Sequence, residues 1–234
     1  MKRSEINTIL SDSLKFLDDM HFLLPPFAHW TPAQWRRKGP ESRDIIEQQL
    51  GWDITDFGSG DFEKIGLFLF TIRNGTLRDR KSPDGKTYAE KVMIVREGQV
   101  TPTHFHFQKM EDIINRGGGN LVMRVWNATP SEGLASSKVT LAKDGVRITV
   151  KAGGLVRLLP GESVCLPRRN YHSFWGEKGR GTVLVGEVSR VNDDRTDNRF
   201  LEPIGRFPTI AEDAAPLRLL VGDYGKWYGK AARR

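Results

Sequence analysis

Short apolar segments separated by glycine-bearing turns occupy the chain from residue 65 to residue 188. Each is long enough for a β-strand, and none approaches the roughly 18 apolar residues that a membrane-spanning helix needs. Regularly spaced short strands are typical of a sandwich or barrel, so the sequence predicts an all-β fold. The predicted strands include Ile65–Arg73, Tyr88–Glu97, Leu121–Trp126, Val139–Leu141, Val146–Val150, Gly154–Leu158, Ser163–Leu166 and Thr182–Val188.

The N-terminal region has a helical pattern instead. Apolar residues recur at helical spacing over Arg3–Met20, with Ser4 as the candidate N-cap, and Pro40–Leu50 suggests a further helix. We therefore expect residues 1–60 to form a helical arm that packs on the barrel and is not part of its wall. The barrel is expected at 61–222, with an edge strand at Leu217–Val221, and a basic tail at 223–234.

Three histidines and one glutamate are spaced as a metal site requires. Successive side chains of a strand point to opposite faces, so His104 and His106 lie on one face. Glu111 is an odd number of residues past His106, so a bulge or turn must bring its carboxylate round. His172, in a second strand pattern, is the natural third imidazole. The alternative is that the histidines are merely half-buried strand residues.

These residues also resemble the two motifs of the cupin superfamily. The first motif is matched at Gly98, His104, His106, Glu111 and Gly118. The second is matched at Gly161, Pro167 and His172. Its middle glycine is replaced by Arg169, and its final asparagine falls on Gly176, which puts the turn before His172 in question. The resemblance implies a cupin fold, a double-stranded β-helix or jelly-roll barrel, here with an N-terminal helical arm.

Three imidazoles and a carboxylate suit a six-coordinate Mn, Fe, Co or Ni ion with two exchangeable positions. An open-chain sugar offers a matching pair of oxygens, the carbonyl and the neighbouring hydroxyl, and a bound metal would lower the cost of forming an enediolate. A proton must still move between the carbons. Lys91, Lys109 and Glu187 are candidates for that step, although each has the alternative of an ordinary surface or ion-paired role.

Two longer blocks, Tyr88–Asn127 and Gly186–Phe200, resemble the D-lyxose ketol-isomerase family of cupins, and the resemblance extends roughly over residues 5–222. It implies interconversion of D-lyxose and D-xylulose, and also of D-mannose and D-fructose. The ionisable candidates favour a route through a cis-enediol, and a direct hydride shift between the two carbons is the alternative. It implies Mn²⁺, with Co, Fe, Ni or Zn as other choices, at His104, His106, Glu111 and His172. The implied sugar contacts are Asp193, Asp197 and Arg206.

Other functions remain open at the level of sequence. One alternative is a sugar-phosphate isomerase, in which basic residues such as Arg168 and Arg169 would bind the phosphate. A dioxygenase and a non-catalytic sugar-binding cupin are further alternatives, because both can have the same barrel. The net charge of +7 is scattered, and no nucleic-acid-binding module accompanies it, so we expect neither a nucleic-acid nor a membrane partner. The single cysteine, Cys165, excludes an internal disulfide framework and a cysteine-based metal site.

The expected location and assembly follow from weaker signals. Acidic residues interrupt the N-terminal apolar pattern, which therefore differs from a secretory signal, and a cytoplasmic location is the default. A barrel with a helical arm and an edge strand would leave apolar surface that a symmetric partner could cover, so we expect a homodimer.

Overall fold

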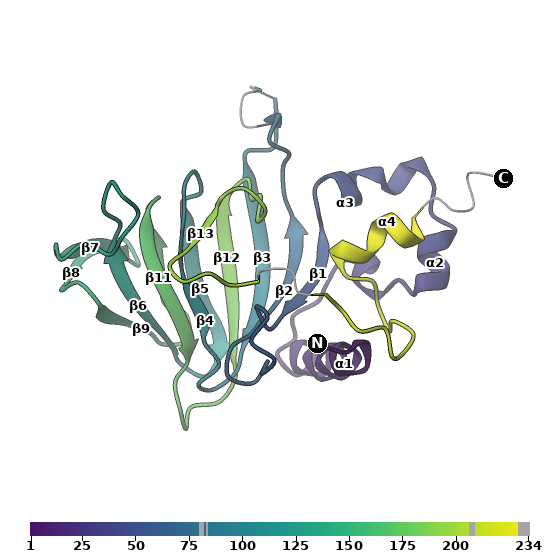
Figure 1. The fold of residues 1–234 in the computed structure, drawn as a ribbon, viewed down its shortest axis with the longest axis horizontal. Coiled ribbons are helices and arrows are strands. Elements are labelled where there is room, and N and C mark those ends of the chain that lie inside the picture. Colours follow the sequence, from purple (N-terminus) through teal and green to yellow (C-terminus); the bar gives the residue numbers. More distant parts are fainter. Residues whose placement is uncertain (80–81, 83, 206–208, 229–234) are drawn as a thin grey trace.

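The computed structural model describes residues 1–79, 82, 84–205 and 209–228, and its core is a pair of facing antiparallel sheets (Figure 1). The larger sheet is built from β1 (Gly51–Thr55), β2 (Leu67–Arg73), β3 (Tyr88–Val95), β5 (Glu111–Gly118), β7 (Val139–Lys143), β8 (Val146–Val150), β10 (Ser163–Leu166) and β12 (Val183–Arg190). Its strand order is β1-β2-β3-β12-β5-β10-β7-β8.

The smaller sheet covers the inner face of the larger one. It is built from β4 (Thr101–His106), β6 (Leu121–Asn127), β9 (Gly154–Leu158), β11 (Asn170–Gly176) and β13 (Asn198–Phe200). Its order is β13-β4-β11-β6-β9, so strands that are distant in the chain are neighbours in space. This arrangement confirms the predicted all-β cupin architecture.

Both faces of the larger sheet are buried near its β1 edge, because helices cover the outer face (Figure 1). Alternation along β2 illustrates this: Leu67 and Leu69 pack in the core between the sheets, while Phe68 and Phe70 pack in a second core on the outer side. The helical segments are α1 (Arg3–Asp19), η1 (Pro26–His29), α2 (Pro32–Arg36), η2 (Pro40–Ser42), α3 (Arg43–Glu47), η4 (Val221–Asp223) and α4 (Tyr224–Trp227).

The long helix α1 supplies most of the outer core. Its apolar stripe, which includes Ile6, Leu10 and Leu17, packs in one cluster with Trp52 of β1. The predicted helix is confirmed, but Ser4 is not its cap. Lys2 holds the N-cap position, and the Ser4 hydroxyl donates to the carboxylate of Asp213 instead.

Two sequence predictions about the edges of the barrel are wrong. Residues up to about 60 were expected to supply no barrel strand, yet β1 pairs antiparallel with β2 along its full length. Leu217–Val221 is not an edge strand. Leu220 makes one isolated bridge to Trp52, and the chain then enters η4 and α4, where Tyr224 is buried and donates to the carbonyl of Leu50. No described helix is both long and apolar enough to cross a membrane.

Candidate active site

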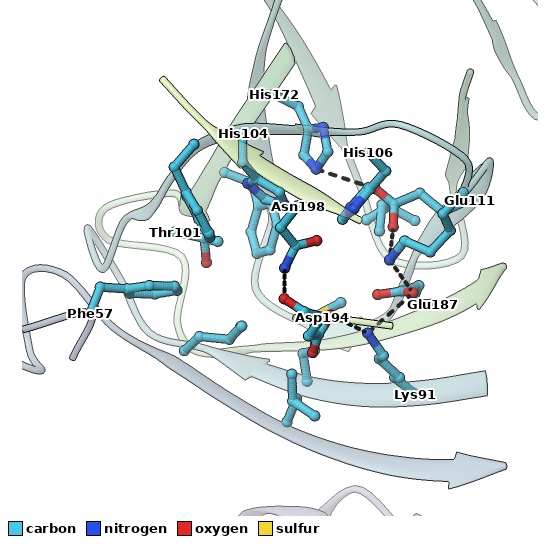
Figure 2. Close-up of a pocket in the computed structure, with 17 residues that line it drawn as sticks. Phe57, Lys91, Thr101, His104, His106, Glu111, His172, Glu187, Asp194 and Asn198 are labelled. Carbon is cyan, nitrogen blue, oxygen red and sulfur yellow. Dashed lines mark hydrogen bonds and ion pairs between the residues drawn. The ribbon is translucent and has the colours of Figure 1, made fainter. Parts of the chain in front are cut away.

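A cavity lies between the sheets, with about 440 Å³ of space that is partly open to solvent, and its lining contains the four predicted metal ligands together with Lys91, Lys109 and Glu187. In Figure 2 the three histidines and Glu111 face one another at one end, with Lys91, Glu187 and Asp194 beside them. The rest of the wall is apolar and comes from the core between the sheets, including Leu67, Leu69, Met93, Ile113, Phe174 and Phe200.

The imidazoles come from two neighbouring strands. His104 and His106 lie on β4, and His172 on β11 is directly paired with His104 in the ladder. Ligand atoms of the three rings lie within 4.8 Å of one another, and all three residues are buried. Strand pairing therefore brings together histidines that are far apart in the chain.

Hydrogen bonds fix which ring nitrogen faces the cavity. The Nδ1 atom of His104 lies 2.8 Å from the carbonyl oxygen of Pro102, and that of His172 lies 3.1 Å from the carbonyl oxygen of Asn170. A carbonyl can only accept, so both Nδ1 atoms donate, and the unprotonated Nε2 atoms are left to the site. Burial lowers the pKa of His104 well below its ordinary value and that of His172 to about 4, which keeps both rings neutral.

Glu111 enters the site as the first residue of β5. The break between β4 and β5 provides the turn that its spacing required, and the side chain is almost wholly buried. Its Oε1 lies 3.2 Å from Nε2 of His172 and 3.4 Å from Nε2 of His106, yet it has no hydrogen-bond partner among the described residues. Burial by itself would raise the pKa of this carboxyl, but the Lys109 charge holds it well below its usual range.

These contacts decide whether the residues fit a cation. The Nε2 of His172 carries a lone pair, because the ring proton is on Nδ1, and it faces a carboxylate oxygen that also has no donor. Two electron-rich atoms this close repel each other unless a positive charge lies between them. The donor set of three imidazoles and one carboxylate therefore fits a divalent cation.

The turn before His172 keeps its shape despite the missing glycine. Arg169, at the position of the motif's middle glycine, has a φ of 60°, so it adopts the left-handed conformation that a glycine would favour. Its guanidinium donates to the carbonyl of Thr129 and lies over the ring of Phe105. Gly176 ends β11 where a Cβ would lie 2.6 Å from the carbonyl oxygen of Arg96. These contacts explain how the second motif tolerates its two departures.

An alternating array of ammonium and carboxylate groups extends from the histidines. The Nζ of Lys109 lies 2.7 Å from Glu111 Oε2 and 2.8 Å from Glu187 Oε1, and the Nζ of Lys91 lies 3.6 Å from both Glu187 Oε1 and Asp194 Oδ1. Burial opposes the charge on Lys109, but the two carboxylates raise its pKa. Burial likewise works against the charge on Glu187, yet the two lysines keep its pKa below the ordinary value. At neutral pH both groups are ionised.

Two of the three residues expected to contact sugar, Asp193 and Asp197, are not part of the cavity wall. Asp193 accepts from Thr196 and from the backbone N–H of Arg195, within its own loop. Asp197 accepts from the backbone N–H groups of Gln108 and Lys109. Arg206 lies outside the described residues.

Three polar residues that were not predicted as site residues also line the cavity: Thr101, Asp194 and Asn198. Asp194 and Asn198 belong to the Asn- and Asp-rich loop at 192–198, and the Asn198 amide donates to the Asp194 carbonyl at 3.3 Å. Asn198 also begins β13, opposite His106. A strand pattern at Asn198–Phe200 would have pointed to Asn198 and Phe200, but the segment is too short for its alternation to be recognised. Phe57 faces Phe200 with ring centroids 5.8 Å apart.

Comparison with known proteins agrees with this geometry. The chain is 52% identical over 225 residues to a D-lyxose/D-mannose isomerase of Serratia proteamaculans, covering 96% of this chain and 98% of that protein. It is 50% identical, with the same coverage, to a D-lyxose/D-mannose isomerase of Escherichia coli O157:H7.

Solved structures with little sequence similarity share the fold. L-ribose isomerase of Acinetobacter sp. DL28, a variant with L-ribose bound, has a TM-score of 0.61 at 15% identity and covers 90% of this chain and 98% of its own. L-ribose isomerase of Cellulomonas parahominis has a TM-score of 0.60 at 17% identity, covering 91% of this chain and 97% of its own. Residues 1–224 match the D-lyxose isomerase family, and with two relatives at about half identity the chain belongs to that family of aldose–ketose isomerases.

Proposed function

We propose that this chain interconverts D-lyxose and D-xylulose, and D-mannose and D-fructose, with a divalent cation held by His104, His106, His172 and Glu111. The observation that carries the proposal is the Glu111 Oε1 atom, which has no hydrogen-bond partner among the described residues and lies close to the Nε2 atoms of His106 and His172, next to the ionised Lys109 and Glu187. The names of the two half-identical relatives support the same pair of aldoses.

The cation would act as a Lewis acid toward the sugar carbonyl and the neighbouring hydroxyl, and it would stabilise negative charge developing on those oxygens. We propose Mn²⁺. The support is the nature of the ligands, which are imidazole and carboxylate without thiolate, a set that Co, Fe, Ni and Zn also accept.

The protein's own groups handle the protons. Glu187 is the base that we propose to take the proton from C2 of the aldose and return it to C1, because it is ionised and its carboxylate opens to the cavity. Lys109 remains protonated between Glu111 and Glu187, so it fixes the orientation of both carboxylates. Lys91 supplies a second ammonium within 3.6 Å of Glu187 Oε1 and can donate toward sugar hydroxyls.

The remaining cavity wall is divided by polarity in a way that suits a sugar chain. Asp194 and Asn198 offer hydrogen-bonding groups on one side, while Phe57 and Phe200 offer flat apolar surfaces on the other. Hydroxyl groups require donors and acceptors, whereas the C–H faces of a sugar pack on aromatic rings. We therefore propose Asp194 and Asn198 as sugar contacts, in place of Asp193, which is bonded within its own loop, and Asp197, which is bonded to the backbone at Gln108 and Lys109.

The test is an aldose panel assayed with metal-stripped and Mn²⁺-reloaded protein. Chelation should abolish turnover of D-lyxose and D-mannose, and Mn²⁺ should restore it, since metal ions held without thiolate ligands are removable. Full activity in thoroughly demetallated protein would contradict the proposal. A homodimer, a cytoplasmic location and the division into arm, barrel and tail stay predictions; light scattering at micromolar concentration tests the first.

A further inference from the structure

A second chamber lies beside the candidate active site. It encloses about 1410 Å³, part of it open to solvent, and its walls come from β1, β2, the 192–195 loop and residues 209–212 and 220–223. Leu69 and Asp194 line both cavities. The reaction site is therefore next to a space larger than itself.

Strand register shows how the two spaces are related. Thr71 of β2 is paired with Lys91 of β3, and Leu69 with Met93. Lys91 and Met93 line the first cavity, and Thr71 lines the second. Because neighbouring strands are about 4.8 Å apart, the second chamber begins one strand beyond Lys91 on the same inner face of the sheet. The Lys91–Asp194 ion pair, at 3.6 Å, lies at the boundary.

The walls of the chamber have the mixed chemistry that sugars require. The side chains of Gln49, Thr71 and Asn192 line it, and none of them forms a hydrogen bond with another residue in the described part of the chain. Leu69 and Leu220 provide apolar surface between them. Unused donors and acceptors that face an enclosed space next to apolar patches are typical of a small-molecule binding site.

We infer that this chamber binds the second sugar unit of a disaccharide whose reducing unit is an aldose in the first cavity, so that the chain also isomerises glycosyl-substituted aldoses. The inference rests on the proposed function. O1 and O2 of the reacting unit have to be free, so we place the substituent at O4 or further along the chain, toward Asp194, which lines both cavities.

The reaction at the reducing unit needs no additional reactant. A proton leaves C2 and one is added at C1, the hydroxyl proton of O2 is given up and O1 gains one, and the glycosidic bond is left intact. The aldose end of the disaccharide becomes a ketose end with the same composition.

The experiment compares three sugars with Mn²⁺-loaded protein: D-mannose, its 4-O-β-mannosyl disaccharide and its 2-O-mannosyl disaccharide, followed by NMR. The 4-O-linked sugar should be converted to the corresponding mannosyl-fructose. The 2-O-linked sugar should not react, because its O2 is blocked, which makes it the matched control.

Variants of the chamber separate binding from catalysis. Asn192→Trp and Gln49→Trp would each place a large side chain in the chamber, and each should lower kcat/KM for the 4-O-linked disaccharide about tenfold or more. The same variants should leave kcat/KM for D-mannose within about twofold, because neither residue lines the first cavity. The same selective loss in both variants would show that the effect does not come from misfolding of one of them.

Two results would overturn the inference. One is turnover of D-mannose while the 4-O-linked disaccharide is neither converted nor a competitive inhibitor. The other is an equal loss for both sugars in the two variants. If the Mn²⁺-loaded protein converts neither D-mannose nor D-lyxose, the proposed function itself is wrong. That outcome can be told apart from the two results above, because in both of them D-mannose is a substrate of the unsubstituted protein.

Discussion

Glu187 is the residue on which the proton-transfer route depends. Its carboxylate is buried, ionised and held by Lys109 at 2.8 Å. Glu187→Gln keeps the shape of the side chain and removes the base, so kcat should fall about 10²- to 10⁴-fold with a much smaller change in KM. Steady-state kinetics on D-lyxose measures this.

Solvent isotope content separates the same route from a direct hydride shift. If a cis-enediol forms and Glu187 carries the proton, turnover in D₂O should place deuterium at C1 of the ketose, at least in part, because a shielded carboxyl exchanges slowly. Product without any solvent deuterium after many turnovers, together with a near-normal kcat in Glu187→Gln, Lys91→Met and Lys109→Met, would overturn the proton route and leave the metal site standing.

Metal occupancy depends on single imidazoles. His104→Ala, His106→Ala or His172→Ala should each remove most of the bound Mn²⁺, because each deletes one of four ligands in a site without thiolates. His21→Ala and His29→Ala are the controls, since both side chains are exposed outside the cavity. Elemental analysis after dialysis is the measurement, and loss of metal in the control variants would contradict the assignment.

Some of these residues could be identified from sequence, and others could not. The histidines could, because two-residue strand spacing dictates that His104 and His106 share a face. Asp194 could not be separated from Asp193, because the loop has no periodicity and adjacent Asp residues there are chemically equivalent. Only the fold shows that Asp193 caps its own turn while Asp194 lies 3.6 Å from Lys91.

At the scale of elements, the site depends on a contact between two loops. The Asp197 carboxylate accepts from the backbone N–H groups of Gln108 and Lys109 at 2.7 and 3.0 Å, which joins the loop that carries Asp194 to the turn that brings in Glu111. Asp197→Ala should destabilise the protein by about 1–3 kcal/mol. It should also lower kcat, because both loops lose their relative position.

Asp213→Ala is the matched control for that variant. Its carboxylate accepts from the backbone N–H and hydroxyl of Ser4, a similar bond far from the cavity. We expect Asp213→Ala to lower the stability of the protein at most and to leave kcat unchanged. Urea denaturation measures the stability of the two variants, and steady-state kinetics on the same preparations measures their kcat. A normal kcat in Asp197→Ala would show that the loop contact has no effect on catalysis.

Two of the strands missed by sequence analysis, β1 and β13, share a physical cause. β1 follows helical segments and contains only five residues, with Asp53 among them, so its apolar alternation was hidden by its surroundings. β13 has three residues. Both are edge strands whose pairing is fixed by neighbours already in place, so local propensity contributes little. Longer central strands such as β3 and β12 were found because each contains a run of buried apolar residues, 92–95 in β3 and 183–185 in β12.

At the scale of the whole molecule, the two ends of the chain are joined by a buried charge cluster. Arg3 donates to Asp223 at 2.8 and 3.0 Å and also pairs with the half-exposed Glu212. Arg3→Met removes the partner of a buried carboxylate, which should cost about 3–5 kcal/mol of stability. Arg43→Met is the control, because its pair with Glu47 is exposed and is worth at most about 0.5 kcal/mol. Equal unfolding midpoints for the two variants would contradict this account.

The pairing of distant strands in both sheets also has a kinetic consequence. β4 meets β11, and β5 meets β12, only after long loops have closed, so the ligand-bearing strands come together late in folding. Mn²⁺ should therefore leave the refolding rate nearly unchanged and slow unfolding, because it binds only the closed form. Stopped-flow refolding and unfolding with and without Mn²⁺ would measure both rates. The cation would then determine how long a folded molecule lasts rather than how quickly it forms.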